Sequence, residues 1–337
     1  ILVRLKMKNF CIIFSLFFLV SCANQSNNEL TIYTSRQPQL LEPILENFYQ
    51  DTGIKVNLLS GNAQELMERI AAEGEQSKAD IFMTVDAGVL WQATDRNIFS
   101  KINSFILEDN IPSYLRDPDS HWFGLSKRAR TIVYSSDQFS EGDFSSYEDL
   151  AHPKWRGKLC LRTSKKVYNR SLMASMIDAY GYDQAKEIVS GWVANLATEV
   201  FSNDTNALKA VSSGQCGVTI VNTYYLARLL DDPKYSNLQL FWANQSGRGV
   251  HVNISGAGIV KTSKNKENAQ KLLEYLSSDS AQDFYASANK EYPVLKEADI
   301  ADSIKDWGSF IEDDINVSKL GSLQKEAVFL AQEVGYK

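Results

Sequence analysis

Histidine is scarce in this chain of 337 residues, which contains only His121, His152 and His251. None of them forms an HExxH phrase or another paired-ligand spacing, so the sequence gives no sign of a zinc hydrolase. GxSxG, Walker and GxGxxG phrases are also missing from any strand–turn–helix context. His152, in the phrase AHPKW, is expected to be a loop residue. We therefore predict that the chain is not an enzyme.

An excess of positive charge is absent as well. The chain has 35 Lys and Arg against 41 Asp and Glu, a formal net charge of −6, which argues against a general nucleic-acid binder. No short repeat, low-complexity tract or second membrane segment is present. With 44% hydrophobic residues, the length suits one large or two medium soluble domains.

The first 22 residues differ from the rest. Arg4, Lys6 and Lys8 precede FCIIFSLFFLV, an apolar run too short to span a bilayer comfortably. The following order Leu-Val-Ser-Cys resembles a bacterial lipobox, with Cys22 as the lipidated residue. We predict a lipoprotein-type signal peptide over 1–22 and a polar tether over 23–29. A plain secretory signal with an incidental cysteine is the alternative.

Cysteine is also rare, with four in the chain. Cys11 and Cys22 belong to the predicted signal, which leaves Cys160 and Cys216. An even pair in an oxidising compartment is compatible with a disulfide, and two buried free thiols are the alternative. Two cysteines so far apart in sequence do not suggest a metal site.

Strand-like and helical stretches alternate along the remaining chain, which predicts the α/β class. ADIFMTV (79–85) is a continuous apolar run, typical of a strand buried on both faces of a parallel sheet. The other strand-like stretches are 30–35, 54–60, 131–137, 157–163, 197–202, 216–221 and 249–263. The helical patterns are LLEPILENFYQDTG, NAQELMERIAAEG, NRSLMASMIDAYG, DTNALKAVSSG and KENAQKLLEYLSSDSAQDFYAS, the last read as two helices. This order predicts two lobes joined by crossing strands, with a ligand cleft between them.

A set of phrases resembles one protein family over essentially residues 30–330. The phrases are LTIYTSRQP, DTGIKVNLLSGNAQELMERIAAEG, ADIFMTVDAG, WFGLSKRARTIVY, HPKWRGKLCLR, VYNRSLMASMI, NDTNALKAV, SGQCGVTIVNTYYLARL, VHVNISGAGIV and EYPV. Together they resemble the ferric-ion-binding solute-binding proteins of bacterial ABC importers, within the periplasmic binding protein superfamily. The most specific phrases are VYN and NTYY.

The resemblance implies a type II periplasmic binding protein fold, in which each lobe is a mixed sheet flanked by helices. We expect an N-terminal lobe of 30–130 plus 250–305 and a C-terminal lobe of 131–249 plus 306–337. The hinge is expected near 129–134 and 248–256. It further implies a monomeric receptor in the periplasm that delivers Fe³⁺ to an inner-membrane ABC permease and its ATPase. The alternative is a receptor of the same fold for a polyamine or an oxyanion.

The implied iron ligands are Tyr168, Tyr224 and Tyr225. Fe³⁺ is a hard ion that favours anionic oxygen, and three phenolates would cancel its charge. Because free tyrosine has a pKa of about 10, the ion must displace the phenol protons, and binding should weaken on acidification. Adjacent tyrosines can share one ion if it lies at the mouth of their helix, which is expected to start at Asn222 or Thr223 as the cap.

The first lobe departs from the family pattern, because SRQP places Gln37 and Pro38 where many relatives have histidine and tyrosine. One expectation is a synergistic anion such as carbonate, held by the guanidinium groups of Arg36 and Arg130. Arg128 is a weaker candidate for this role, and a solvated surface charge is the alternative interpretation of each of these arginines. The alternative is that Gln37 or water completes the ion's shell directly.

Three further residues have two open interpretations each. Arg228 lies one helical turn after the tyrosine pair, where it would hydrogen-bond to a ligand oxygen or remain a surface arginine. Tyr33 points either into the cleft or away from it. Asp86 either caps the next helix or lines the cleft.

Overall fold

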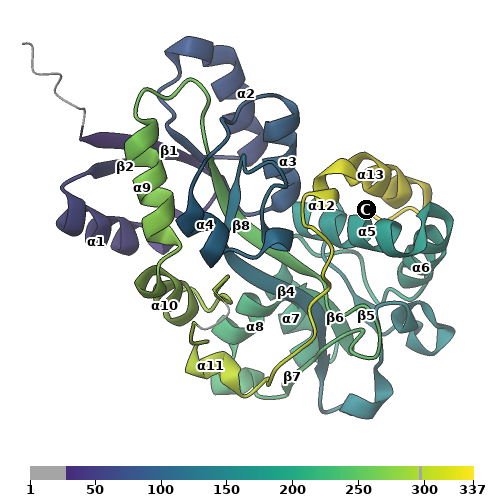
Figure 1. Cartoon of the computed structure of the whole chain (residues 1–337). Coiled ribbons are helices and arrows are strands. Elements are labelled where there is room, and N and C mark those ends of the chain that lie inside the picture. The colour runs from purple at the N-terminus through teal and green to yellow at the C-terminus, as the bar shows by residue number, and fades with distance from the viewer. Residues whose placement is uncertain (1–27, 296–297) are drawn as a thin grey trace, which may run out of the picture.

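One continuous sheet passes through both lobes of the computed structural model, which describes residues 28–295 and 298–337 (Figure 1). Its strand order is β2-β1-β3-β8-β4-β6-β5, with β7 paired to β4. The strands are β1 (Glu29–Thr34), β2 (Lys55–Ser60), β3 (Ile81–Thr84), β4 (Phe123–Ser135), β5 (Leu159–Cys160), β6 (Val218–Asn222), β7 (Leu238–Phe241) and β8 (Val252–Ile259). β1 pairs in parallel with β2 and β3, whereas β8 is antiparallel to its neighbours, so the sheet is mixed as predicted.

Strand β4 joins the lobes. Its first part, from Phe123 to Ala129, pairs with β8, and its second part, from Arg130 onward, pairs with β6 and β7. The change of partner falls between Ala129, opposite Val252, and Arg130, opposite Asn222. This position lies within the two segments predicted to cross between the lobes.

Helices flank the sheet in both lobes. Figure 1 shows α1, α2, α3 and α9 around β1 and β2, and α5 and α6 around the other end of the sheet. The helices are α1 (Glu42–Thr52), α2 (Ala63–Glu73), α3 (Ala87–Asp95), α4 (Phe105–Asn110), α5 (Val167–Tyr180), α6 (Tyr182–Ala194), α7 (Asp204–Ser212), α8 (Thr223–Leu229), α9 (Lys266–Leu276), α10 (Asp279–Ser287), α11 (Asp302–Lys305), α12 (Lys319–Ser322) and α13 (Gln324–Glu333).

Local sequence explains the ends of α1 and α2, which were predicted at Gly53 and Gly74. Gly53 adopts a left-handed φ of 69° and closes α1, a conformation that costs glycine little. The Asn62 side chain accepts hydrogen bonds from the backbone N–H groups of Gln64 and Glu65, which fixes the start of α2. Gly74 is the C-cap of α2, where its N–H donates to the Ile70 carbonyl, so both helices end where the sequence predicts.

Each lobe has its own hydrophobic core. Phe48, Phe82 and Trp122 lie in the first, and Trp155 and Trp192 lie in the second. The predicted lobe boundaries stay a prediction. The segment 306–337, assigned by the sequence to the second lobe, places Val317 and Leu320 in the first core and Leu330 in the second.

Several predicted elements differ from the structure. The predicted strand 197–202 is wrong, because only Ala197 and Phe201 bond backbone to backbone, to the carbonyls of Leu159 and Leu161, and the chain loops between them. The strand predicted over 157–163 shortens to the two residues of β5. Helix α6 and strand β7 were not predicted.

Cys160 and Cys216 form a disulfide that ties β5 to the segment before β6. We expect the double variant Cys160→Ala/Cys216→Ala to lose about 2–4 kcal/mol of unfolding free energy, since the bridge closes a long loop in the unfolded chain. Urea unfolding of the variant and the wild type measures this loss. Addition of reductant should lower the stability of the wild type only, and equal stability of both proteins with and without reductant would indicate two free thiols.

The predicted signal peptide and residues 23–27 of the predicted tether lie outside the described residues, and Glu29 already belongs to β1. Within 28–295 and 298–337, every helix is too short or too polar to span a membrane.

Candidate functional site

The three predicted tyrosines line one small cavity. Tyr168 lies in the first turn of α5, and Tyr224 and Tyr225 lie in the first turn of α8. The cavity has a volume of about 130 Å³, and its lining includes all three tyrosines. The rings of Tyr224 and Tyr225 are 4.4 Å apart between centroids, so the adjacent tyrosines do converge. The other lining residues are Ser35, Arg36, Gln37, Leu40, Val85, Arg228 and Glu291.

The start of α8 was predicted correctly, but its capping was not. Asn222 occupies the N-cap position without a side-chain capping bond. Its amide oxygen instead accepts from Arg130, and its amide nitrogen donates to the Tyr224 hydroxyl at 3.1 Å. Asn222 therefore orients a phenol of the site.

Burial controls the protonation of the phenols. Loss of solvent raises the pKa of Tyr224 well above its ordinary value, and the nearby Tyr168 and Tyr225 raise it further. Loss of solvent also raises the pKa of Tyr168, as does Tyr225, while Arg128 and Arg162 oppose the rise. Tyr168 and Tyr224 are therefore neutral phenols in the free protein at neutral pH.

Two arginines contact the Tyr168 ring. The guanidinium carbons of Arg128 and Arg162 lie 5.4 Å and 5.1 Å from its centroid. Arg128 donates to the Val85 carbonyl, while its Nε and Nη1 have no hydrogen-bond partner among the described residues. Positive charge at this distance favours the phenolate form of tyrosine. Sequence reasoning missed Arg162, which is the last residue of the phrase HPKWRGKLCLR but was given no role there.

Arg130 does not fit its predicted role. Its guanidinium donates to five acceptors, which satisfies all its N–H groups, and the side chain is buried. The acceptors are both carboxylate oxygens of Asp204, the amide oxygens of Asn169 and Asn222, and the Ile220 carbonyl. No N–H group remains for an anion, so we do not retain Arg130 as an anion-binding residue.

The other predicted residues reach the cavity. Arg36 is buried and donates to Ser255 and Glu291. Arg228 stacks on the Tyr224 ring at 5.0 Å and donates to the Asn289 carbonyl at 3.0 Å. Gln37 lines the cavity, but its amide oxygen accepts from the exposed Gln39. The roles of Arg36, Gln37 and Arg228 toward a ligand stay predictions.

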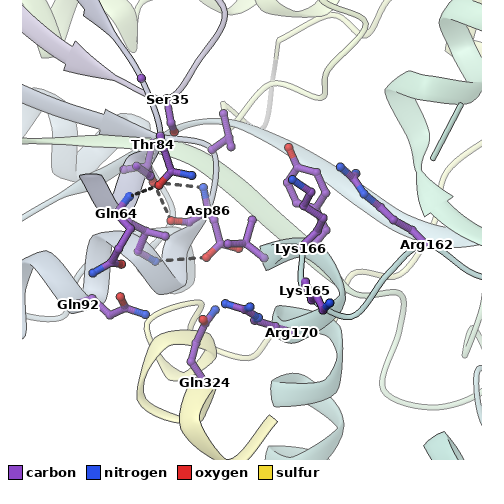
Figure 2. A pocket seen from close by; sticks show the side chains of 17 residues that line it. Ser35, Gln64, Thr84, Asp86, Gln92, Arg162, Lys165, Lys166, Arg170 and Gln324 are labelled. Atoms are coloured by element: carbon purple, nitrogen blue, oxygen red, sulfur yellow. Dashed lines mark hydrogen bonds between the residues drawn. The ribbon is translucent and has the colours of Figure 1, made fainter. Parts of the chain in front are cut away.

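A larger cavity of about 640 Å³ shares Tyr168 with the first one. Figure 2 shows Ser35, Thr84 and Asp86 on one side, with Arg162 and Lys166 on the other. Lys165 and Arg170 add to the positive side, which forms the approach to α5 and its first turn. This cleft therefore suits an anionic group better than a cationic one.

Asp86 meets both of its predicted interpretations. Its Oδ1 accepts from the Val89 N–H and caps α3, while its Oδ2 accepts from Ser171 of α5 at 2.7 Å and from Asn253. Burial raises its pKa, although these hydrogen bonds oppose the rise. Asp86 thus links the helices on the two sides of the cleft.

Two of the remaining residues lie away from the site. The Tyr33 hydroxyl donates to Glu73 at 3.1 Å and lines neither of the two cavities described above. His152 is a loop residue as predicted, where its ring nitrogen accepts from the Lys154 N–H.

Comparison with known proteins shows the family of this chain. The family model of bacterial extracellular solute-binding proteins matches residues 76–312. The chain belongs to this family. This solute-binding protein is 44% identical over 315 residues to iron uptake protein A1 of Synechocystis sp., covering 92% of this chain and 88% of that protein. It is 25% identical over 280 residues to the Fe(3+)-binding periplasmic protein of Serratia marcescens, covering 81% and 80%.

Solved structures agree with this solute-binding protein in fold. The Trichodesmium protein in complex with iron and citrate ligands has a TM-score of 0.88 at 44% identity, covering 92% of this chain and 100% of that chain. The ferric binding protein from Campylobacter jejuni has a TM-score of 0.86 at 36% identity, covering 91% and 100%. One of these proteins is in complex with iron and the other is a ferric binding protein, so the predicted fold class and family resemblance are confirmed.

Proposed function

We propose that this solute-binding protein captures Fe³⁺ between its lobes through the phenolates of Tyr168, Tyr224 and Tyr225. The observation that carries the proposal is the convergence of these three side chains, from two separate helices, on one cavity of about 130 Å³. Phenolate is a hard anionic oxygen donor, as Fe³⁺ prefers. Three of them neutralise the ion.

An anion is proposed to accompany the ion. Arg36 and Arg228 line the cavity, and Arg128 and Arg162 flank Tyr168. This excess of guanidinium groups favours a small oxyanion such as carbonate, or the carboxylate of a ferric chelate, beside the metal. The similar Trichodesmium protein is in complex with iron and citrate ligands, which supports this part of the proposal.

Capture is proposed to close the lobes about the hinge where β4 changes partner. The segment after α10 already contacts α8 and the residues just after it. Arg228 donates to the Asn289 carbonyl, and Lys290 forms an ion pair with Asp231 at 2.7 Å. The closed form would then be recognised by an inner-membrane ABC permease and its ATPase. We further propose a monomer that acts in the periplasm, is anchored by lipid on Cys22, and has no catalytic activity.

The alternative function is a receptor for an oxyanion without iron. The basic lining of the larger cavity favours it, since Arg162, Lys165, Lys166 and Arg170 face one acidic side chain there, that of Asp86. The same lining disfavours a polyamine, which would need acidic partners. Binding of Fe³⁺ and binding of an oxyanion to metal-free protein, measured side by side, distinguish the two functions.

Titration of metal-free protein with ferric citrate tests the proposal. We expect a visible phenolate-to-iron charge-transfer band that saturates at one iron per chain. Because burial keeps Tyr168 and Tyr224 protonated in the free protein, binding must release their protons. Affinity should therefore fall as the pH falls, by about tenfold per pH unit for each phenol that ionises on binding.

The affinity is measured against a chelator of known proton uptake, between pH 5 and 8. A pH-independent affinity would contradict phenolate ligation. Tight binding of an oxyanion by metal-free protein, with no band on addition of iron, would support the alternative function instead.

A further inference from the structure

We infer that Glu291 is a fourth protein ligand of the ion and the one that the first lobe supplies. This inference rests on the proposed ferric-ion function and assigns a role that the sequence motifs did not indicate. Glu291 is the only acidic residue that lines the small cavity with the three tyrosines, among the residues that the structure describes. It follows α10 and bonds Arg36, which follows β1, and Ser126 of β4, whereas the tyrosines lie on α5 and α8.

The carboxylate of Glu291 is held in one orientation. Its side chain is 6% exposed, and its Oε2 accepts from Arg36 at 2.9 Å and from Ser126 at 2.5 Å. Its Oε1 accepts no hydrogen bond from residues 28–295 or 298–337. One oxygen is therefore fixed by the protein while the other is free at the cavity.

This arrangement is typical of a carboxylate prepared for a metal. A metal-bound carboxylate commonly gives one oxygen to the ion, while hydrogen bonds to its other atoms fix its direction. Carboxylate oxygen is also a hard donor that suits Fe³⁺. Arg36 balances the added negative charge, since it is itself buried beside Glu291.

The neighbouring residues in the first lobe are poorer donors. Pro38 has no side-chain donor atom, and the amide oxygen of Gln37 is neutral and accepts from Gln39. Glu291 is anionic and more buried than Gln37. Because Gln37 and Pro38 replace the histidine and tyrosine of many relatives, the first lobe lacks those ligands. We assign that ligand position to Glu291.

The position of Glu291 also connects binding with closure. Asn289 and Lys290 contact Arg228 and Asp231, which lie at the end of α8 and just after it. Glu291 itself is held by Arg36 and Ser126, whereas the tyrosines start α5 and α8, so two different sets of elements supply the sides of the cavity. An ion held by both sides stabilises the closed state, because neither side alone provides all the ligands.

The variant Glu291→Gln tests the inference, with Glu267→Gln, at an exposed glutamate of α9 outside the cavity, as the matched control. For Glu291→Gln, we expect ferric affinity to fall about 100-fold, the effect of removing one charged partner from a buried site. The charge-transfer band should keep its intensity, since the phenolates remain, and move to longer wavelength, since iron with fewer anionic donors accepts charge more easily. Glu267→Gln should leave both the band position and the affinity unchanged.

A role of Glu291 in orienting Arg36 for an anion predicts a different result. In that case, the effect of Glu291→Gln would vanish in bicarbonate-free buffer and the band would not move. Such a result, or an unchanged affinity, would overturn the inference. Absence of the band in the wild type would instead overturn the proposed function.

A second measurement avoids the variant, because loss of the partner of Arg36 could impair folding. A crystal structure of the iron-loaded wild type should place Oε1 of Glu291 within bonding distance of the metal, on the order of 2 Å for a metal–oxygen bond. A metal bound by the three tyrosines with Oε1 beyond contact would refute the inference and leave the proposed function intact.

Discussion

Replacement of Tyr168 or Tyr225 by phenylalanine is expected to reduce ferric affinity by about 10²- to 10⁴-fold, equivalent to the roughly 3–5 kcal/mol lost when one charged partner leaves a buried site. Each substitution removes one phenolate oxygen and leaves the ring in place. The ion then keeps a net positive charge in a cavity that already contains Arg36 and Arg228. The charge-transfer band should weaken and shift, and competition with citrate measures the affinity.

The matched control is Tyr49→Phe, since Tyr49 lies on α1 with 44% of its surface exposed. This variant should bind iron as the wild type does. If both cavity variants keep their colour and affinity, the three tyrosines do not hold the ion. A loss that is equal in Tyr49→Phe would indicate a general defect of folding.

Substitution Asp204→Asn is expected to lower the free energy of unfolding by about 3–5 kcal/mol, because it leaves a buried guanidinium without its charged partner. Asp204 is fully buried and pairs with Arg130 at 2.9 Å. It also lies 3.5 Å from Arg162, so two cations lose their counter-charge. Urea unfolding, followed by circular dichroism, measures the change.

Asp302→Asn is the matched control, because Asp302 is exposed and pairs with Lys305 on the surface. Solvent screens such a pair, so no measurable change is expected. Similar stability of Asp204→Asn and the wild type would mean that water reaches the buried pair. Since Arg130 donates to Asn222, which orients Tyr224, the Asp204 variant should also weaken the site.

The parts of the site that were predictable are those written in a short stretch of sequence. Tyr224 and Tyr225 are adjacent and follow a strand, so their place at the start of a helix could be predicted from NTYY. The ends of α1 and α2 are equally local, since Gly53 and Asn62 act on their own helices. Such features depend mainly on residues that are close in sequence.

The parts that could not be predicted depend on distant partners. Arg130 looked available for an anion because nothing near it in sequence is acidic, but Asp204 lies 74 residues further along the chain and binds it. Arg162 lies 3.5 Å from the same distant Asp204 and 5.1 Å from the Tyr168 ring, an arrangement that its neighbours in sequence do not indicate. The segment 197–202 has strand-like residues but too few backbone partners to extend the sheet.

The location of the tyrosines has a consequence for release. All three belong to α5 and α8, on one side of the cleft. Under the proposed function, parting the lobes would therefore expose the ion without detaching it. Its hand-over to a transporter would need a chemical step, either protons that return to the phenolates or an electron from an external one-electron reductant that converts the ion to the more weakly held ferrous form.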